Sequence, residues 1–224
     1  MGFIVAIDGT AGTGKSTIAK AISKEQGFTY IDTGAMYRAI TLYLLTNNID
    51  LNDKKSIEDV LKKIDIKFEK LENDNQIVLL NGENVTSRIR DVDITNSVSK
   101  VSSIKEIRFK MVELQRNMAE GKDVIMEGRD ITTLVFPNAN VKIYLDASVR
   151  ERAKRRYKEF NEKGINITLK QVEEDIIVRD KQDKEKEIGA LKIAEDAIYI
   201  DTSTLSIIQV KEKINSIIDL KREN

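Results

Sequence analysis

The sequence contains no cysteine, no histidine and no tryptophan, and it has a single proline among 224 residues. The absence of cysteine excludes disulfides, thiolate-bound metals and thiol nucleophiles. The absence of histidine excludes imidazole general bases and histidine-ligated zinc. Any catalysis must therefore depend on lysine, arginine, carboxylate and hydroxyl groups, and on metal-bound phosphate. Phosphoryl transfer can proceed with those groups alone, because it depends on positioning and charge stabilisation.

The sequence also lacks a net charge and a long apolar run. Its 37 basic and 37 acidic residues balance, so no overall basic field attracts nucleic acid or acidic membranes. No apolar run approaches the roughly 20 residues of a membrane span. Residues 1–4 pass directly into an apolar stretch, without a basic leader segment. We therefore expect a cytoplasmic protein that acts as a monomer, with neither nucleic acid nor a membrane as its partner.

A complete phosphate-binding pattern of the form G-x-x-x-x-G-K-S/T lies close to the start of the sequence, and Thr17 follows it directly. The pattern consists of Gly9, Thr10, Ala11, Gly12, Thr13, Gly14, Lys15 and Ser16. Residues 3–7 before it have strand character, and residues 18–22 after it have helical spacing. This order of strand, loop and helix is the context that the motif requires. A plain glycine-rich turn before a helix is the alternative, and it does not explain the full pattern.

The chemistry of this loop fits a nucleoside triphosphate. Glycines allow backbone N–H groups to turn inward toward an anion, and the helix N-terminus adds the positive end of its dipole. We expect Lys15 to contact the outer phosphates and to neutralise charge during catalysis. We expect the Ser16 hydroxyl to bind Mg²⁺.

Five short apolar runs are candidate strands of one parallel sheet. They lie at residues 3–7, 28–31, 123–127, 141–145 and 197–200. Helical patterns separate several of them, which is typical of an α/β fold with helices on both faces of the sheet. The glycine loop then lies at the carboxyl end of a strand, where such sheets bind their ligands.

A small antiparallel insert interrupts the alternation of strands and helices. Residues 64–69 and 76–80 have strand patterns, and residues 73–75 (Asn-Asp-Asn) are a turn signal between them. Asn81-Gly82 supplies a second turn signal. This region is therefore predicted to lie outside the parallel sheet.

A densely charged helical region covers residues 149–187. Thr168 and Gln171 form a plausible capping box at the start of its second helix. Ser206 similarly opens a C-terminal helix that is expected to end near Leu220.

One polar segment, residues 32–38 (Asp-Thr-Gly-Ala-Met-Tyr-Arg), follows the second predicted strand and opens a helix. Asp32 or Thr33 could be a plain helix N-cap. That interpretation leaves Arg38 unexplained, one turn further in and beside a helix N-terminus that is suited to anions.

A second polar segment, residues 127–130 (Glu-Gly-Arg-Asp), follows another predicted strand. The plain interpretation is a turn with a solvent-exposed ion pair. The functional interpretation places both side chains in the ligand crevice. Arg129 offers a planar fork for phosphate oxygens, and Asp130 can accept hydrogen bonds from amino or hydroxyl groups.

The charged helices have two interpretations as well. Taken alone, residues 151–156 and 179–186 are ordinary solvated helix faces. Arg179, Asp183 and Lys186 would share one face, at i, i+4 and i+7. Together with a phosphate loop, these helices favour a mobile lid that brings cations over a triphosphate.

The combined motifs resemble those of the bacterial-type cytidylate kinases, a family of nucleoside-monophosphate kinases. The similarity extends from about residue 3 to 220 in unbroken order. The phosphate loop is common to many families, and the T-G-A-x-Y-R, G-R-D and F-P-x-A segments are more specific. The similar segments are residues 6–17, 32–38, 127–131, 135–139, 141–148 and 179–180.

The resemblance implies transfer of the γ-phosphoryl group of ATP to CMP or dCMP with Mg²⁺. It also implies one P-loop kinase domain over residues 1–224, with an antiparallel monophosphate-binding insert and a helical lid. The core is expected at about residues 1–46, 100–148 and 188–224, the insert at about 47–99 and the lid at about 149–187.

The same resemblance assigns roles to individual residues. Residues 9–17 would bind ATP, and Arg152 and Arg155, with Arg156 as a third candidate, would stabilise the transferring phosphoryl group. Arg38 and Arg129 would hold the CMP phosphate, with Thr33 beside them. The base would contact Ser99, Arg108 and Asp130, and the sugar would contact Arg179 and Asp183. Arg129 is counted as both catalytic and substrate-binding.

Two positions depart from the family pattern. The lid usually has the form R-D-x-x-D-x-x-R, and Lys186 stands at its last position, among the predicted substrate-binding residues. Lysine is a point charge and cannot form a two-pronged clamp. Gly189-Ala190-Leu191 replaces an Ala-Pro-Leu segment.

Three other functions remain as alternatives. One is a related P-loop kinase for another monophosphate or for shikimate. A second is a regulatory NTPase, although the sequence has no N-K-x-D guanine-recognition motif. A third is nucleic-acid binding through residues 150–156, which the balanced charge and the lack of interleaved aromatic residues disfavour.

Overall fold

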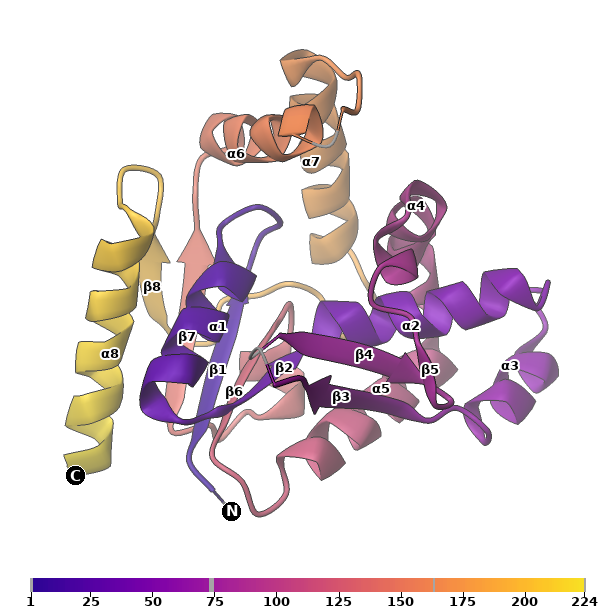
Figure 1. Ribbon diagram of the computed structural model, residues 1–224, viewed down its shortest axis with the longest axis horizontal. Helices are drawn as coiled ribbons and strands as arrows, with labels where there is room; N and C mark the ends of the chain where they lie inside the picture. Colours follow the sequence, from indigo (N-terminus) through magenta and orange to yellow (C-terminus); the bar gives the residue numbers. More distant parts are fainter. Residues whose placement is uncertain (1, 73–74, 163, 224) are drawn as a thin grey trace. The chain divides into compact units, whose positions relative to one another are not determined.

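The computed structural model describes residues 2–72, 75–162 and 164–223 (Figure 1). The chain forms two compact units. Unit 1 consists of Met1–Tyr30 and Ala119–Asn224, and unit 2 consists of Ile31–Met118. In the described part of the chain, no helix is long and apolar enough to cross a membrane.

A five-stranded sheet has the order β2-β6-β1-β7-β8. Its strands are β1 (Ile4–Gly9), β2 (Thr29–Asp32), β6 (Val124–Gly128), β7 (Val141–Asp146) and β8 (Ile198–Asp201). β1 pairs in parallel with both β6 and β7, and β7 pairs in parallel with β8. Continuous apolar runs suit strands that are buried on both faces, and every residue of β1 and β6 is buried. The predicted strands and the predicted α/β class are therefore confirmed.

Two helices of unit 1 pack on this sheet. α1 (Lys15–Gln26) contributes Ile18 and Ile22 to the core, and α8 (Ile207–Glu223) contributes Ile214. These side chains recur at helical spacing, so each helix presents one apolar stripe to the strands. Gln209 N–H donates to the Ser206 hydroxyl, as predicted, and α8 continues three residues beyond Leu220.

The predicted charged region forms α6 (Val149–Glu162) and α7 (Leu169–Lys184), which pack on each other in Figure 1. Their small apolar core contains Ala153, Val172 and Ile176. The capping box of Thr168 and Gln171 is present with both of its hydrogen bonds.

Unit 2 contains four helices and a small sheet among its described residues. The helices are α2 (Thr33–Thr46), α3 (Lys54–Leu61), α4 (Val92–Val101) and α5 (Lys105–Ala119), with a 3₁₀ turn η1 (Arg88–Arg90) before α4. The sheet contains β3 (Ile66–Lys70), β4 (Gln76–Leu80) and β5 (Glu83–Asn84), paired antiparallel in that order. The predicted antiparallel insert is thus confirmed.

Of the two turns predicted for this insert, the structure describes the one at Asn81-Gly82 completely. Asn81 and Gly82 have φ of 51° and 86°, the left-handed values that a tight hairpin turn needs. This turn leads into β5, a third strand that the sequence analysis did not predict. Of the other predicted turn, residues 73 and 74 lie outside the described residues.

Candidate active site

The glycine loop connects β1 to α1, as predicted. Gly12 and Gly14 have φ of 83° and 90°, in the left-handed region that favours glycine. Gly9 has φ of 150°, and a Cβ atom there would lie 1.9 Å from the carbonyl oxygen of Leu145. Gly9 is therefore required because β7 passes too close for a side chain, and Gly12 and Gly14 are required by their left-handed backbone conformation.

Lys15 is the first residue of α1, and only 5% of it is exposed. Its Nζ donates to the carbonyl oxygen of Thr10 at 2.6 Å. Burial lowers the pKa of Lys15 to about 7, and the positive charge of Arg129 acts in the same direction. The carboxylates of Glu127 and Asp8 oppose this shift. The lysine thus lies in a dry, cation-rich site, where an anionic ligand gains most from it.

Ser16 donates a hydrogen bond from its hydroxyl to Oε1 of Glu127. The Tyr30 hydroxyl donates to the same oxygen at 3.1 Å. Glu127 is buried at the carboxyl end of β6, so the structure places a carboxylate beside the predicted metal ligand. Glu127 belongs to the polar segment 127–130, but the sequence alone predicts no role for it. Its position at the end of a strand beside the phosphate loop was the available signal.

Whether this site can hold Mg²⁺ depends on the oxygen atoms of Ser16 and Glu127. Among the described residues, no cluster of three or more acidic side chains could hold a metal ion. Mg²⁺ usually binds through one or two protein oxygens, substrate phosphates and water. The Ser16 hydroxyl and the Glu127 carboxylate fit that pattern of hard oxygen donors.

The two predicted lid arginines both contact the glycine loop. Arg152 is buried, and its guanidinium donates to the carbonyl oxygens of Ala147 at 2.9 Å and of Ala11 at 3.2 Å. Its third bond, at 2.6 Å, goes to Asp180 of α7. Arg152 therefore connects the loop, the end of β7 and both lid helices.

Arg155 lies one turn away on α6. Its Nη1 donates to the Thr13 carbonyl at 3.5 Å, and its Nη2 donates to the Thr202 carbonyl at 2.6 Å. The Thr202 hydroxyl also donates to the Thr13 carbonyl, at 3.3 Å. The neighbouring Arg156 instead lies over the ring of Phe160.

Three predicted substrate-binding residues form one charged cluster. Arg129 Nε donates to Oδ2 of Asp183 at 2.8 Å, and Lys186 Nζ donates to Oδ1 at 2.9 Å. Burial opposes ionisation of Asp183, but the charges of Arg129 and Lys186 are stronger and hold its pKa well below the ordinary value. Burial would lower the pKa of Arg129, but the negative charge of Asp183 outweighs this effect and raises the pKa of the guanidinium. Asp183 and Arg129 therefore form an ion pair at neutral pH.

The path of the chain around this cluster differs in one respect from the expectation. α7 ends at Lys184, so Lys186 lies beyond the helix and not on the shared face predicted with Arg179 and Asp183. Lys186 still contacts Asp183, because the chain turns back after the helix and Leu191 N–H bonds to the Asp183 carbonyl at 2.8 Å. Arg179 is half-buried, and its charge lowers the pKa of Lys15.

Asp130 is 4% exposed and lies directly after β6 and Arg129. Its negative charge is close enough to Asp8 to raise the pKa of that residue. Unit 1 thus brings together Lys15, Ser16, Arg129, Asp130, Arg152, Arg155, Arg179, Asp183 and Lys186.

Unit 2 contains the other four predicted substrate-binding residues. Thr33 is the first residue of α2, and Arg38 lies in the second turn of the same helix. Asp32 is the N-cap of this helix and accepts from the Ala35 N–H at 2.8 Å. A Cβ atom on Gly34 would lie 3.1 Å from both the Arg38 guanidinium and the Asp32 carboxylate. The arginine therefore extends back over the first turn of the helix, whose N-terminus attracts anions.

Ser99 and Arg108 of unit 2 are connected through Ser102. Arg108 is 2% exposed and donates to the Ser102 carbonyl at 3.0 Å. The Ser102 hydroxyl donates in turn to the Ser99 carbonyl at 3.0 Å. The guanidinium also lies over the ring of Tyr37 in α2, with 5.5 Å between the guanidinium carbon and the ring centroid.

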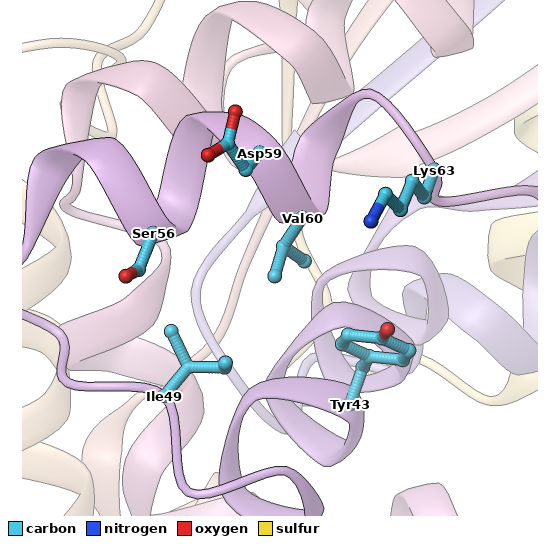
Figure 2. Close-up of a pocket in the computed structure, with 6 residues that line it drawn as sticks. All are labelled: Tyr43, Ile49, Ser56, Asp59, Val60 and Lys63. Carbon is cyan, nitrogen blue, oxygen red and sulfur yellow. The ribbon is translucent and has the colours of Figure 1, made fainter.

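Figure 2 shows a pocket of about 220 Å³ in unit 2. It is lined by Tyr43, Ile49, Ser56, Asp59, Val60 and Lys63. None of these is a predicted site residue, so this pocket is separate from the residues assigned to nucleotides.

Comparison with known proteins places this geometry in a family. Residues 5–220 match the family described as cytidylate kinase. A protein of Lactobacillus gasseri named cytidylate kinase is 54% identical over 220 residues, which cover 98% of this chain and 95% of that protein. Another, from Bacillus velezensis, is 47% identical over 217 residues and covers 97% and 96% of the two chains. The chain belongs to the cytidylate kinase family.

Membership in the cytidylate kinase family confirms the resemblance drawn from the motifs. It also confirms the expected enzyme class, a nucleoside-monophosphate kinase. Among solved structures, an uncharacterized protein from Eubacterium ventriosum has a TM-score of 0.53 at 13% identity and covers 98% of this chain and 99% of its own. That likeness supports the α/β fold alone. The roles of individual site residues stay predictions.

Proposed function

We propose that this protein transfers the γ-phosphoryl group of ATP to CMP, and also to dCMP, and forms the nucleoside diphosphate and ADP. The observation that supports this most strongly is the match to cytidylate kinases over nearly the whole chain. The buried cationic surroundings of Lys15 in the glycine loop supply the chemistry that such a transfer needs.

In the proposed reaction, a phosphate oxygen of CMP attacks the γ-phosphorus of ATP. A bond forms between that oxygen and the γ-phosphorus, and the bond to the β–γ bridging oxygen breaks. The electron pair stays on ADP. The protein contributes position and positive charge, since negative charge spreads over the transferred oxygens.

The donor side of the site consists of residues 9–17 with the lid arginines. The loop N–H groups bind the phosphates of ATP, and Lys15 neutralises charge on the outer ones. Arg152 and Arg155 already contact the loop carbonyls, at Ala11 and Thr13. From there their guanidinium groups stabilise the transferred phosphoryl group.

Magnesium would be held by Ser16, with Glu127 next to it. When bound, the ion would offset the negative charge of the phosphates. Glu127 orients the Ser16 hydroxyl through the bond that this hydroxyl donates to it.

The acceptor side uses the remaining residues. Arg38 and Arg129 hold the CMP phosphate, and Thr33 belongs to the same helix as Arg38, α2. Asp130, with Ser99 and Arg108, contacts the base. Arg179 and Asp183 hold the sugar, and Lys186 fixes the Asp183 carboxylate. That the protein works as a monomer in the cytoplasm stays a prediction.

A coupled assay of ADP release tests this function. CMP, dCMP, UMP, AMP, GMP and shikimate are offered in turn with ATP and Mg²⁺. We expect turnover with CMP and dCMP to exceed that with every other acceptor. Preference for a purine monophosphate or for shikimate would overturn the proposal.

A further inference from the structure

A short turn follows Arg129 and Asp130, and its capping is unusual. The turn, η2 (Ile131–Val135), is a single π-helical turn with Asp130 at its N-terminal capping position. An aspartate at that position ordinarily accepts the first free N–H groups of its own turn. Here the Asp130 side chain makes no capping bond.

The capping bonds are made by Asp8, from the neighbouring strand β1. Its Oδ1 accepts from the Ile131 N–H at 2.9 Å, and its Oδ2 accepts from the Thr132 N–H at 2.7 Å. The Thr132 hydroxyl donates to the same Oδ2 at 2.6 Å. Asp8 is fully buried, so this carboxylate is bound on both oxygens away from water.

Asp8 also fixes the other side of the same segment. Its backbone is paired with Gly128 in the parallel ladder of β1 and β6. Arg129 and Asp130 are therefore a two-residue bridge, and both ends of it are attached to Asp8. The backbone ladder fixes the end at Gly128, and the side chain fixes the end at Ile131 and Thr132.

Burying a carboxylate is energetically unfavourable, so the hydrogen bonds of Asp8 are expected to have a structural or functional role. Burial raises the pKa of Asp8 to about 6, although the bonds from Thr132 and Ile131 act in the opposite direction. Nearby Asp130 adds repulsion. An apolar residue would avoid this cost but would leave the turn uncapped and the bridge unfixed.

We propose that Asp8 is a positioning residue for the acceptor nucleotide, because it holds Arg129 and Asp130 in the orientation that CMP requires. This inference rests on the proposed function of those two residues. Asp8 itself touches no substrate in this role. Its effect passes through the geometry of the bridge, so it should act on the acceptor more than on ATP.

Thr132→Val provides the cleanest test, because it removes one hydrogen bond and no charge. The matched control is Thr132→Ser, which keeps the hydroxyl group. We expect Thr132→Val to raise the KM for the acceptor about five- to tenfold, less than the loss of a direct bond to the substrate because the effect passes through the bridge, with the KM for ATP within about twofold. Thr132→Ser should behave like the wild type.

Asp8→Asn provides the stronger perturbation. The amide has one acceptor oxygen in place of two, so it cannot accept from both Ile131 and Thr132. We therefore expect a rise in acceptor KM of more than about tenfold and a smaller preference for CMP over UMP. A thermal unfolding curve for each variant verifies that the fold is kept. Should Asp8→Asn fail to fold, the comparison of Thr132→Val with Thr132→Ser still tests the proposed role of Asp8.

The inference is overturned if Thr132→Val leaves the acceptor KM unchanged, or if acceptor and ATP values rise equally. Failure of the proposed function looks different, because the wild type would then prefer another acceptor. In that case the same KM ratio is measured with the acceptor that the wild type uses best.

Discussion

At the scale of single residues, the site depends on charges held in dry surroundings. Lys15 is the clearest case, because its ammonium group is buried near Arg129 and balanced by Glu127 and Asp8. A buried cation beside a second cation favours a phosphate ligand, because the ligand's negative charge offsets the repulsion between the two. Its contribution should therefore appear in turnover more than in stability.

We expect Lys15→Ala to lower kcat by at least about a thousandfold while the fold is kept. The measurement is steady-state turnover with CMP and ATP, together with a circular dichroism melt. Lys24→Ala, at an exposed position of the same helix, is the control and should keep wild-type turnover. Near-normal turnover of Lys15→Ala would remove this lysine from the phosphate site.

Asp130 is the residue predicted to select the base. Cytosine has an amino group at C4, where uracil has a carbonyl, and an ionised carboxylate can only accept hydrogen bonds. CMP should therefore be preferred over UMP by a wide margin. Asp130→Ala should narrow that margin, mainly through loss of CMP use. Equal use of CMP and UMP by the wild type would mean that Asp130 does not recognise the base.

Asp8 is expected to contribute less to the stability of the fold as the pH rises. Its pKa rises from an ordinary 3.8 to about 6 in the folded protein, so the fold favours the protonated form. Its contribution is fully present below about pH 4 and is lost as the pH rises through about 6. Measured against Asp8→Asn by urea unfolding, the wild-type advantage should fall by about 3 kcal/mol across this range. A difference that stays level from pH 4 to 7 would contradict the assignment.

At the scale of elements, α6 and α7 are the part predicted to move as a lid. Their mutual core is small, and Arg152 and Asp183 connect them to the rest of unit 1 through ion pairs and hydrogen bonds. Such a pair of helices can open without disturbing the large apolar core of the sheet.

Hydrogen exchange tests this behaviour. On binding of a bisubstrate analogue, amides of α6 and α7 should become protected, because closure adds contacts to both helices. Amides in β1 and β7 serve as an internal control, since these buried strands are expected to be protected with and without ligand. Unchanged exchange in α6 and α7 would make them a fixed scaffold.

The elements also show what the sequence could and could not predict. The five parallel strands were predictable, because each contains a short, mainly apolar run and helical patterns separate several of them. β5 was not, since Glu83-Asn84 has no apolar pattern and becomes a strand only by pairing with β4. The capping of η2 was equally hidden, because its acceptor, Asp8, is 123 residues away from Ile131.

The candidate site shows the same difference between residues in local motifs and residues whose partners are distant in the sequence. Residues in local motifs, such as Lys15 and Arg129, could be chosen from the sequence because the motif and the chemistry coincide. Glu127 and Asp8 were given no role, because their importance depends on partners from other strands. Lys186 was placed on a continuous helix, and only the structure shows the chain turning back so that it reaches Asp183.

At the scale of the whole molecule, the predicted acceptor residues are divided between the two units. Arg129, Asp130, Arg179, Asp183 and Lys186 belong to unit 1, and Thr33, Arg38, Ser99 and Arg108 belong to unit 2. The family resemblance assigns the CMP phosphate to one arginine from each unit. Their substitution therefore tests whether both units serve the same substrate.

We expect Arg38→Ala and Arg129→Ala each to raise the KM for CMP by about tenfold or more, the effect of losing a hydrogen bond between charged groups. The KM for ATP should change far less in Arg38→Ala. Arg129→Ala should also lower kcat, because its charge acts on Lys15 and because Asp183 loses a partner. Arg90→Ala, at an exposed position of unit 2, is the matched control. Equal effects on CMP and ATP in Arg38→Ala would exclude that residue from the acceptor site and leave unit 1 alone to hold the CMP phosphate.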